Sequence, residues 1–550
     1  MLKAKKVLAL GLTMAMLSTL VTGCGNSTSQ SSSESSKSEE VPGSTAAVES
    51  TEAAYVPSYP IVDEPITVTA VVLNQDMTNE RLLWQELEKL TNIHVEFINV
   101  ESEQLPVFLA SNEWPDFFYG GISGSLSKSA MYEYGVLGGK LVDYTEYKDI
   151  MPNLWKVFEE YPLAQLCATQ ENGAIYGLPR IEESCTNTMG RLHYNSYFLE
   201  ENNLEIPSTP EEFYEVLVAC RDLNNGAAPL VTGIKTNDYL VQLLYPAFGE
   251  DVQIALHDDG TGTVRDGRLE QQYRDYLTYL NKLYEEGLLH QEYLTLDTTS
   301  MLGLVKEGTG IFFAECAMSV TEDFFPDGQY HIGTMSPFVA KEGDTPRMVS
   351  TASVKGSFWF NINAESPYIE EICKLVDIAF ATEEVQEGTG LYGLAFNYGP
   401  VGTIIHLNDD NTYSLTLPDG SSEGYTTDWC YDNVLYSMAG IMQLKEYISS
   451  SAGNSQERQI GYRDNVIPYC TGELFPSQYF VYTAEEQETL DQYTVELDTY
   501  LGEMMHKFIM GVEDIHDDAA WEAYCKQVEA YGLNEVLKVR QAAYDRFLGK

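Results

Sequence analysis

The chain has 550 residues, and 44% hydrophobic residues with 42 Gly and 21 Pro are typical of a globular protein of several domains. Its charge is unusual, because 83 Asp and Glu against 32 Lys and Arg give a formal net charge of -51 at pH 7. This charge argues against a nucleic-acid binder and against adsorption on anionic lipid, since both need basic patches.

The N-terminus has the pattern of a signal peptide. Three lysines precede a 14-residue apolar run, Val7 to Leu20, which is too short to cross about 30 Å of hydrocarbon. Small residues then lead to Cys24 and resemble a bacterial lipobox. We expect residues 1–23 to be a lipoprotein signal peptide and Cys24 to be lipidated, which would anchor the chain on the extracytoplasmic face of the cell membrane. The alternative is an ordinary signal peptide with an incidental cysteine.

Residues 24–55 are expected to be a disordered tether behind the lipidated cysteine. The segment 25–54 is rich in Ser, Thr, Glu and Ala and has no aromatic residue. Such a composition cannot bury enough apolar surface to offset the entropy of ordering. No later stretch is apolar for 18 residues, so no membrane-spanning helix is expected.

Eight further cysteines lie in the predicted globular part. None forms a CxxC pair, so a zinc site is not expected, and in an oxidising compartment disulfides are optional rather than required. Several are expected to be buried thiols, and the pairing of the others stays open. They are Cys167, Cys185, Cys220, Cys316, Cys373, Cys430, Cys470 and Cys525.

The globular part opens with a strand, helix, strand pattern. The β-rich run Ile66–Leu73 is followed by leucines at helical spacing over 83–90 and by alternating apolar residues over 93–97. This predicts a βαβ unit with a parallel sheet. Ligands bind beyond the carboxyl ends of strands in such sheets, so the turn that contains Asp76 is a candidate binding loop.

Later segments predict helices and hairpins. Thr209–Glu212 is a capping box with proline at the first helical position, and residues 273–284 carry an apolar stripe at helical spacing. Asp258–Gly262 and Asn408–Asn411 are predicted hairpin tips; their acids are interpreted as exposed turn residues, because neither segment has the ligand spacing of a calcium loop. The last 65 residues are predicted to be mostly helical.

Common catalytic motifs are missing from the sequence. There is no HExxH, Walker loop or GxSxG. Gly388–Gly393 matches GxGxxG, but it follows a predicted helical stretch, Ile369–Gln386, rather than a strand, so nucleotide binding is not expected. A carboxylate pair for glycoside hydrolysis cannot be singled out among 83 acids.

Aromatic content is high, with 37 Tyr and 6 Trp. Aromatic faces stack on sugar rings and carboxylates accept hydrogen bonds from sugar hydroxyls, whereas the alternative is that most of these rings pack in the core or at its rim. The aromatic residues expected in loops are Tyr119, Tyr176, Tyr239, Tyr245, Tyr398, Tyr425, Tyr431, Trp114, Trp359 and Trp429.

Several short motifs recur in a recognisable order. They are Leu90–Glu96, Leu109–Asp116, Gly173–Pro179, Asn203–Phe213, Leu283–Leu288, Phe508–Gly511, Trp521 and Ala542–Arg546. Together they resemble the family 1 extracellular solute-binding proteins over nearly the whole predicted mature chain, and the last three resemble large lipoprotein members from Gram-positive bacteria. The resemblance implies the type 2 periplasmic-binding fold, which delivers carbohydrate or similar solutes to ABC importers.

The resemblance also implies an α/β architecture of two lobes, joined by hinge strands and ending in a helical C-terminal segment. The crossings would lie just after Pro179 and at Met348–Trp359. Lobe one would comprise 56–180 and 357–404, and lobe two 181–356 and 405–550. The lobes would close on the ligand between them.

Ligand-binding positions carry over from the family only approximately, because a shift of one residue in a strand turns a side chain to the other face. Asp116 is interpreted as structural. The candidates in lobe one and at the hinges are Asp76, Tyr119, Ser123, Glu183 and Trp359. The candidates in lobe two are Tyr239, Tyr245, Glu315 and Trp429.

One departure from the family concerns metal. Relatives often carry an Asp-Pro-Asn-Gly-Asn-Gly calcium loop after the helix that begins near Pro210. Here Asp222–Gly226 leads directly into 227–230 and lacks the downstream acids. We therefore expect no metal there, and no cofactor.

The resulting hypothesis is a monomeric, non-enzymatic receptor that presents a solute, most simply an oligosaccharide, to the permease subunits of an ABC importer. The net charge favours a neutral or cationic solute over a strongly anionic one. A sensor that presents ligand to a membrane kinase is an alternative from within the binding proteins. A cell-surface glycoside hydrolase is the alternative from another class.

Overall fold

Two large hydrophobic cores organise the chain, and each forms around its own β-sheet. The computed structural model contains Tyr55–Lys550 as one compact unit. It describes residues 57–550 except for 75, 112, 122–123, 185–190, 234–236, 259, 316–319, 351–353, 422–428, 430–431, 435–439, 445–446, 451–453 and 474. The expected signal peptide and Cys24 lie outside the described residues.

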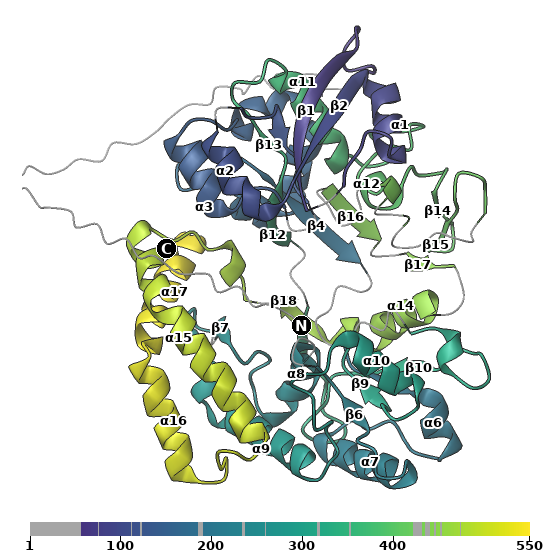
Figure 1. Cartoon of the computed structure of the whole chain (residues 1–550), viewed down its shortest axis with the longest axis vertical. Helices are drawn as coiled ribbons and strands as arrows, with labels where there is room; N and C mark the ends of the chain where they lie inside the picture. The colour runs from purple at the N-terminus through teal and green to yellow at the C-terminus, as the bar shows by residue number, and fades with distance from the viewer. Residues whose placement is uncertain are drawn as a thin grey trace, which may run out of the picture. The chain divides into compact units, whose positions relative to one another are not determined.

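The first core surrounds a sheet with the strand order β13-β3-β1-β2 (Figure 1). Its strands are β1 (Ile66–Leu73), β2 (Ile93–Val100), β3 (Phe117–Phe118) and β13 (Asn361–Ile362). β1 is parallel to both β2 and β3, and α1 (Leu82–Thr91) connects β1 to β2, so the predicted βαβ unit is confirmed. The last part of β1 is buried on both faces, which explains why its sequence is continuously apolar rather than alternating.

Helices and helical turns pack around this sheet. They are η1 (Ser102–Gln104), α2 (Leu105–Ala110), α3 (Lys128–Met131), a π-helical turn η2 (Tyr132–Leu137), η3 (Tyr144–Ile150), α4 (Pro152–Glu160), α5 (Pro162–Ala168), α11 (Ile369–Asp377) and η7 (Ile378–Phe380). The helical run predicted over 369–386 therefore ends six residues early, because Ala381 adopts an extended backbone with φ -73° and ψ 156°.

A second sheet in this half has the order β12-β4-β16. β4 (Leu178–Ser184) pairs antiparallel with β12 (Val354–Trp359) and parallel with β16 (Gly440–Leu444). The two segments predicted as hinge crossings are thus neighbours in one sheet, with Pro179 opposite Phe358. β16 was not predicted.

Residues just after 405 pack with the first half of the molecule, although the sequence analysis assigned 405–550 to lobe two. β14 (Ile405–Leu407), β15 (Thr412–Leu415) and β17 (Ile448–Ser449) form one small sheet, and their apolar side chains cluster with Ala381 and Tyr392. The short helix α12 (Ala395–Tyr398) precedes them. These contacts correct the predicted boundary at 405, because the return to the second core comes after β17.

The second core surrounds a sheet with the order β10-β5-β9-β6. Its strands are β5 (His193–Asn195), β6 (Leu230–Val231), β9 (Phe312–Phe313) and β10 (Ile332–Thr334). The helices and turns of this half are α6 (Ser196–Glu201), α7 (Pro210–Leu223), α8 (Asn237–Leu244), η4 (Tyr245–Phe248), η5 (Gly267–Leu269), α9 (Gln271–Glu285), α10 (Thr298–Lys306) and η6 (Glu322–Phe324). The Thr209 and Glu212 side chains form the predicted capping box of α7.

Both predicted hairpins are present, β7 (Leu256–Asp258) with β8 (Val264–Asp266) and β14 with β15. A further pair, β11 (Met348–Ser350) and β18 (Cys470–Glu473), runs parallel. The turns η8 (Ile467–Tyr469) and η9 (Ser477–Tyr479) flank β18.

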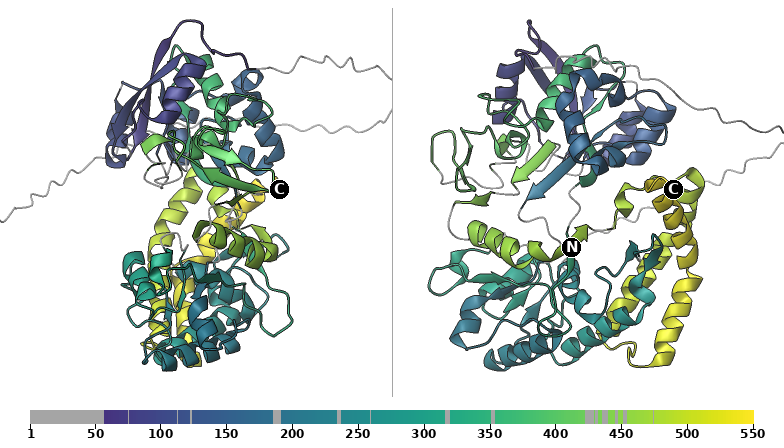
Figure 2. Two further views of the ribbon diagram at one scale, coloured as in Figure 1. Left: turned by 90° about the vertical axis from the view of Figure 1, so that its right-hand side faces the viewer. Right: turned by 180° about the vertical axis from the view of Figure 1, so that it is seen from behind.

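The C-terminal residues are helical, as predicted. α14 (Asn454–Asn465) precedes three helices, α15 (Ala484–Ile509), α16 (Asp518–Ala530) and α17 (Leu533–Phe547), which lie side by side in Figures 1 and 2. α15 also packs on α9 of the second core. Among the helices that the structure describes, none combines the length and the apolar character needed to cross a bilayer.

Cysteines and acids follow the expected pattern. Within the described part of the chain, Cys167, Cys220 and Cys373 are buried free thiols, and Cys470 and Cys525 are partly buried free thiols. Burial raises the pKa of Cys167 and of Cys220 to about 12.

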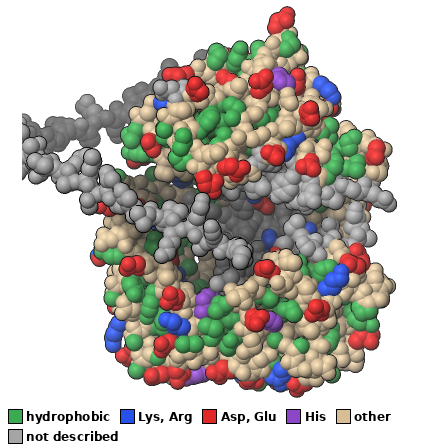
Figure 3. Space-filling model, viewed as in Figure 1, with side chains coloured by type: hydrophobic (Ala, Val, Ile, Leu, Met, Phe, Trp, Pro, Cys, Tyr) green, Lys and Arg blue, Asp and Glu red, His purple; other side chains and the backbone are tan. Residues whose placement is uncertain are grey.

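Figure 3 shows Asp and Glu side chains dispersed over the visible face rather than gathered in one patch, which fits solvated charge.

Candidate functional site

The turn after β1, which the sequence analysis chose as a binding loop, is held from both sides. Asn74 adopts a positive φ of 51°, which Asn tolerates better than most residues. Its side chain donates to Ser102 Oγ at 2.6 Å and accepts from the Ser102 amide at 2.7 Å, so the turn is tied to the end of β2. Asp76 follows with an exposed side chain. The exposed carboxylate of Asp76 therefore follows a residue, Asn74, that is tied to the segment after β2.

Arg81, which the sequence analysis did not select, anchors the other side of this turn. Its guanidinium donates to the Asp76 carbonyl and to the Val434 carbonyl, the latter at 3.2 Å, and the residue is 6% exposed. Burial lowers the pKa of Arg81, and the nearby Tyr119 and Asp432 oppose this shift. Arg81 thus joins the turn after β1 to a segment more than three hundred residues later. A lone arginine just before a helix, in so acidic a chain, is the only sequence signal for this role.

A glycine-rich loop follows β3 and closes against the same sheet edge. A side-chain carbon on Gly121 would lie 2.1 Å from the Leu73 carbonyl oxygen, and one on Gly124 would lie 2.6 Å from the Phe358 carbonyl oxygen. Gly124 also has a φ of +94°. The backbone can approach β1 and β12 this closely only because these residues lack Cβ. The loop therefore depends on glycine for its position.

Three predicted ligand-binding aromatics are buried in the cores. Tyr119 is 0%, Trp359 1% and Tyr245 0% exposed. Tyr119 packs against Trp84 and Phe360 with ring centroids 5.7 and 5.0 Å apart, and burial raises its pKa. The burial of these three side chains favours the packing alternative over contact with a solute.

Trp359 instead positions the glycine loop. Its indole Nε1 donates to the Gly121 carbonyl at 2.8 Å. Ser125 donates to the Phe358 carbonyl at 3.2 Å and to the Asn361 side-chain oxygen, and Asn361 in turn donates to the Tyr176 carbonyl at 2.7 Å. The loop after β3 is therefore fixed to β12 and β13 by buried hydrogen bonds.

Trp429 is a half-buried candidate and Glu315 a buried one, and they lie in different halves of the molecule. Trp429 is half-buried and packs against the first core, rather than belonging to lobe two as predicted, and its carbonyl accepts from Asn433 Nδ2 at 3.0 Å. Glu315 follows β9 in the second half, is 8% exposed, and accepts from Thr298 Oγ1 at 3.1 Å.

Three other candidates cannot be placed. Ser123 lies outside the described residues, and the side chains of Glu183 and Tyr239 do as well. The backbone of Glu183 lies in β4 opposite Gln443 of β16. On the same strand, Arg180 and Glu182 are two residues apart, so they share a face, and their side chains form an ion pair at 2.8 Å.

Asp116 has the structural role that was expected. It accepts from the Thr69 amide at 2.7 Å, from Thr69 Oγ1 at 2.8 Å and from Ser366 Oγ at 2.7 Å. These bonds tie the segment before β3 to β1 and to the chain after β13. Asp116 thereby holds the strand from which the glycine loop emerges.

The described elements place an exposed carboxylate, Asp76, after β1, and a half-buried indole, Trp429, against the first core. Such groups can hydrogen-bond and stack on a polyhydroxylated ligand. No protein-family model matches the chain.

Known proteins resemble this chain in sequence and in overall fold. The chain is 23% identical over 506 residues to the fructooligosaccharide ABC transporter substrate-binding protein FusA of Streptococcus pneumoniae. The aligned region covers 85% of this chain and 87% of FusA. A solute-binding protein of Bifidobacterium longum infantis, described as binding HMO and associated with an ABC transporter, superposes with a TM-score of 0.68 at 18% identity, over 88% of this chain and 99% of the other.

The structure of FusA of S. pneumoniae in complex with kestose superposes with a TM-score of 0.64 at 18% identity, over 88% of this chain and 100% of the other. These findings confirm the resemblance that the sequence motifs indicated. The chain has the two-lobed α/β fold of the solute-binding proteins.

Proposed function

We propose that this chain is an extracytoplasmic receptor that captures an oligosaccharide for an ABC importer. The observation that carries the proposal is the similarity to a fructooligosaccharide-binding protein over most of both chains, together with the shared fold. The named relatives are binding proteins, which supports a receptor rather than an enzyme.

The anchor and the partners belong to the same proposal. Cys24 would carry lipid after removal of residues 1–23, and 24–55 would tether the folded body to the membrane. A relative named as a lipoprotein, LipO of Bacillus subtilis, is 24% identical over 217 residues and supports this. The folded body would act as a monomer that docks on the permease subunits of the importer.

In this proposal the ligand lies at the strand ends of the first sheet and contacts the second half when the lobes close. Asp76 would accept hydrogen bonds from sugar hydroxyls, and Trp429 would stack on a sugar ring. Glu315 would contribute from the second half, with Ser123, Glu183 and Tyr239 as further candidates. A ligand that contacts both halves favours the closed state by its differential affinity for that state.

The proposal is tested by calorimetric titration of the purified chain with kestose and with other oligosaccharides. We expect stoichiometric binding of at least one of them without hydrolysis. We also expect a loss of affinity of about tenfold in Trp429→Ala, which corresponds to about 1.4 kcal/mol for the lost contact with an aromatic ring.

Trp155→Ala is the matched control, since Trp155 is also partly buried in the first core but lies in α4. Its affinity should equal that of the wild-type chain. Release of shortened sugars would contradict the receptor and favour a glycoside hydrolase. Unchanged affinity in Trp429→Ala would place the ligand elsewhere, and equal losses in both variants would show a general effect on the first core rather than a lost contact with the sugar.

A further inference from the structure

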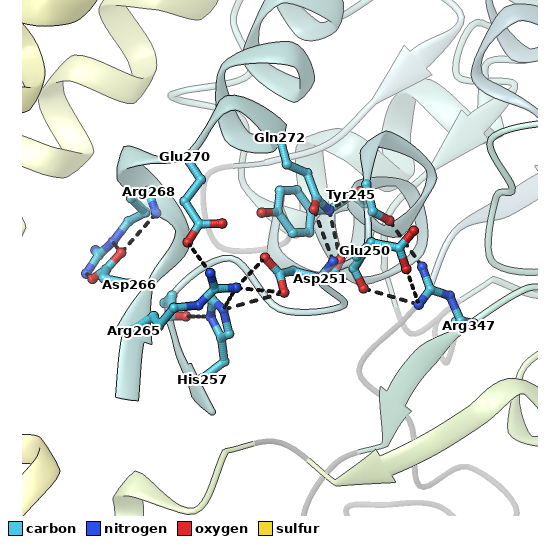
Figure 4. Close-up of polar contacts among 12 residues, drawn as sticks. Tyr245, Glu250, Asp251, His257, Arg265, Asp266, Arg268, Glu270, Gln272 and Arg347 are labelled. Carbon is cyan, nitrogen blue, oxygen red and sulfur yellow. Dashed lines mark hydrogen bonds and ion pairs between the residues drawn. The ribbon is translucent and has the colours of Figure 1, made fainter. Parts of the chain in front are cut away.

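A polar cluster in the second half of the molecule is unrelated to the predicted ligand residues at the strand ends. Asp251, His257 and Glu270 each offer one potential ligand atom, and these atoms all lie within 4.8 Å of one another. Asp251 follows η4, His257 lies in β7, and Glu270 is the residue before α9 (Figure 4). Three separate elements therefore converge on one point.

Arg265, from β8, occupies the centre of this cluster (Figure 4). Its Nη2 lies 3.1 Å from both Asp251 carboxylate oxygens, and its Nη1 lies 3.2 Å from Glu270 Oε1. Nη2 also lies 3.4 Å from His257 Nε2. The guanidinium thus stands where a cation bound by all three groups would stand. Because the Arg265 side chain is 37% exposed, its charged end can turn out into solvent.

His257 has the tautomer that a metal ligand needs. Its Nδ1 lies 2.7 Å from the Ala255 carbonyl oxygen, so Nδ1 carries the proton and donates. Nε2 is left to face the cluster, at 3.7 Å from Asp251 Oδ1, and the side chain is only 5% exposed. Metal-bound histidines commonly donate their other ring N–H to a backbone carbonyl in this way.

Tyr245 is an independent indication that the cluster accommodates a ligand. It is 0% exposed, and within the described part of the chain its hydroxyl has no hydrogen-bond partner. A carbon placed on Gly267 would lie 3.4 Å from both the Tyr245 hydroxyl oxygen and His257 Cε1, so the two side chains flank the same glycine. Figure 4 shows the hydroxyl directed toward the cluster. A buried hydroxyl without a partner is unfavourable, and a water bound to an ion in the cluster would supply one.

The charges of the cluster do not balance. Two carboxyl groups share a single guanidinium as their only permanently charged cationic partner within the cluster, and the side chains of Asp251 and Glu270 are only 21% and 29% exposed. One imidazole nitrogen with two carboxylate oxygens is a ligand set that suits Zn²⁺ and similar ions.

We propose that Asp251, His257 and Glu270 bind a divalent transition-metal ion of the Zn²⁺ class, with Arg265 moving out as the ion enters. The ion would cross-link the turn after η4, the β7–β8 hairpin and the start of α9, and so stabilise the second core. The site is distinct from the Asp222–Gly226 segment, where no metal is expected, and it does not depend on the proposed function.

The test is calorimetric titration of the metal-stripped full chain with ZnCl₂, together with melting curves with and without the ion. We expect one ion per chain and a higher melting temperature in its presence. His257→Ala should weaken binding by about 100-fold or more. Arg265→Ala should bind about tenfold more tightly, because it removes the competing cation.

His331→Ala is the matched control, since the partly buried His331 also lies beside a carboxylate, Asp327, at 2.7 Å, but far along the chain from Asp251 and Glu270. Its affinity should not change. If His257→Ala fails to fold, Glu270→Gln, which keeps the size of the side chain, decides the question by a loss of affinity. Absence of binding in both the wild-type chain and Arg265→Ala, or unchanged affinity in Glu270→Gln, would overturn the proposal.

Discussion

Asp377, at the end of α11, makes the stability of the first core depend on pH. Its carboxyl group is 3% exposed and accepts from the Asn153 amide at 3.3 Å, from Asn153 Nδ2 at 2.8 Å and from the Leu154 amide at 2.8 Å. It therefore joins α11 to the first turn of α4. Burial raises the pKa of Asp377 from its ordinary value of 3.8 to about 7, against the lowering effect of these three donors.

The direction of the pH effect follows from the raised pKa. Between pH 4 and pH 7 the unfolded chain has lost the proton of Asp377 while the folded chain retains it, so this group makes the folded state less stable as pH rises through that interval. A shift of about 3 pH units at about 1.4 kcal/mol each corresponds to about 4 kcal/mol, most of which is lost by pH 7.

The assay is urea unfolding, followed by tryptophan fluorescence, of the wild-type chain and Asp377→Asn from pH 4 to pH 8. The wild-type chain should lose up to about 4 kcal/mol more than the variant across this range, because Asn does not titrate. Asp149→Asn, at an exposed position in η3, is the control and should follow the wild-type chain. Parallel curves for the wild-type chain and Asp377→Asn would refute the reasoning, since they would show that the three N–H donors fully offset the effect of burial on the pKa of Asp377.

Three further substitutions test the architecture of the strand-end loops. Arg81→Met removes the donors that join the turn after β1 to Val434, so the affinity for oligosaccharide, measured by calorimetry, should fall about tenfold. Unchanged affinity would show that Arg81 does not support the binding site. Trp359→Phe removes the indole donor to Gly121 and should lower the free energy of unfolding by about 1–3 kcal/mol in urea; no change would mean that this bond contributes nothing net. Asp116→Asn should lower the free energy of unfolding by a similar amount and leave affinity unchanged, and an affinity loss without a stability loss would contradict its structural role.

Local signals explain what the sequence could predict. The strand Ile66–Leu73 and the capping box at Thr209–Glu212 appear as predicted, because each depends on neighbours within a few residues. The hairpin at Asp258–Gly262 is also local, since turn residues separate two short β-prone runs.

Contacts between segments that are distant in the chain could not be predicted from local sequence patterns. β16 pairs with β4 across some 260 residues of chain, and Arg81 reaches Val434, 353 positions away. Tyr119 and Trp359 show a second limit of sequence-based prediction. The sequence pattern of an aromatic residue in a predicted loop does not depend on whether its ring faces a ligand or the core. Only the packing of the surrounding strands distinguishes these cases.

The central claim, that the chain is an oligosaccharide receptor, is tested most directly by native mass spectrometry of the chain purified from cells grown on a mixture of oligosaccharides. The account predicts a complex of one chain with one intact oligosaccharide, whose mass does not change on incubation. A chain that emerges without a sugar from every such mixture, or with sugars that shorten over time, would contradict it.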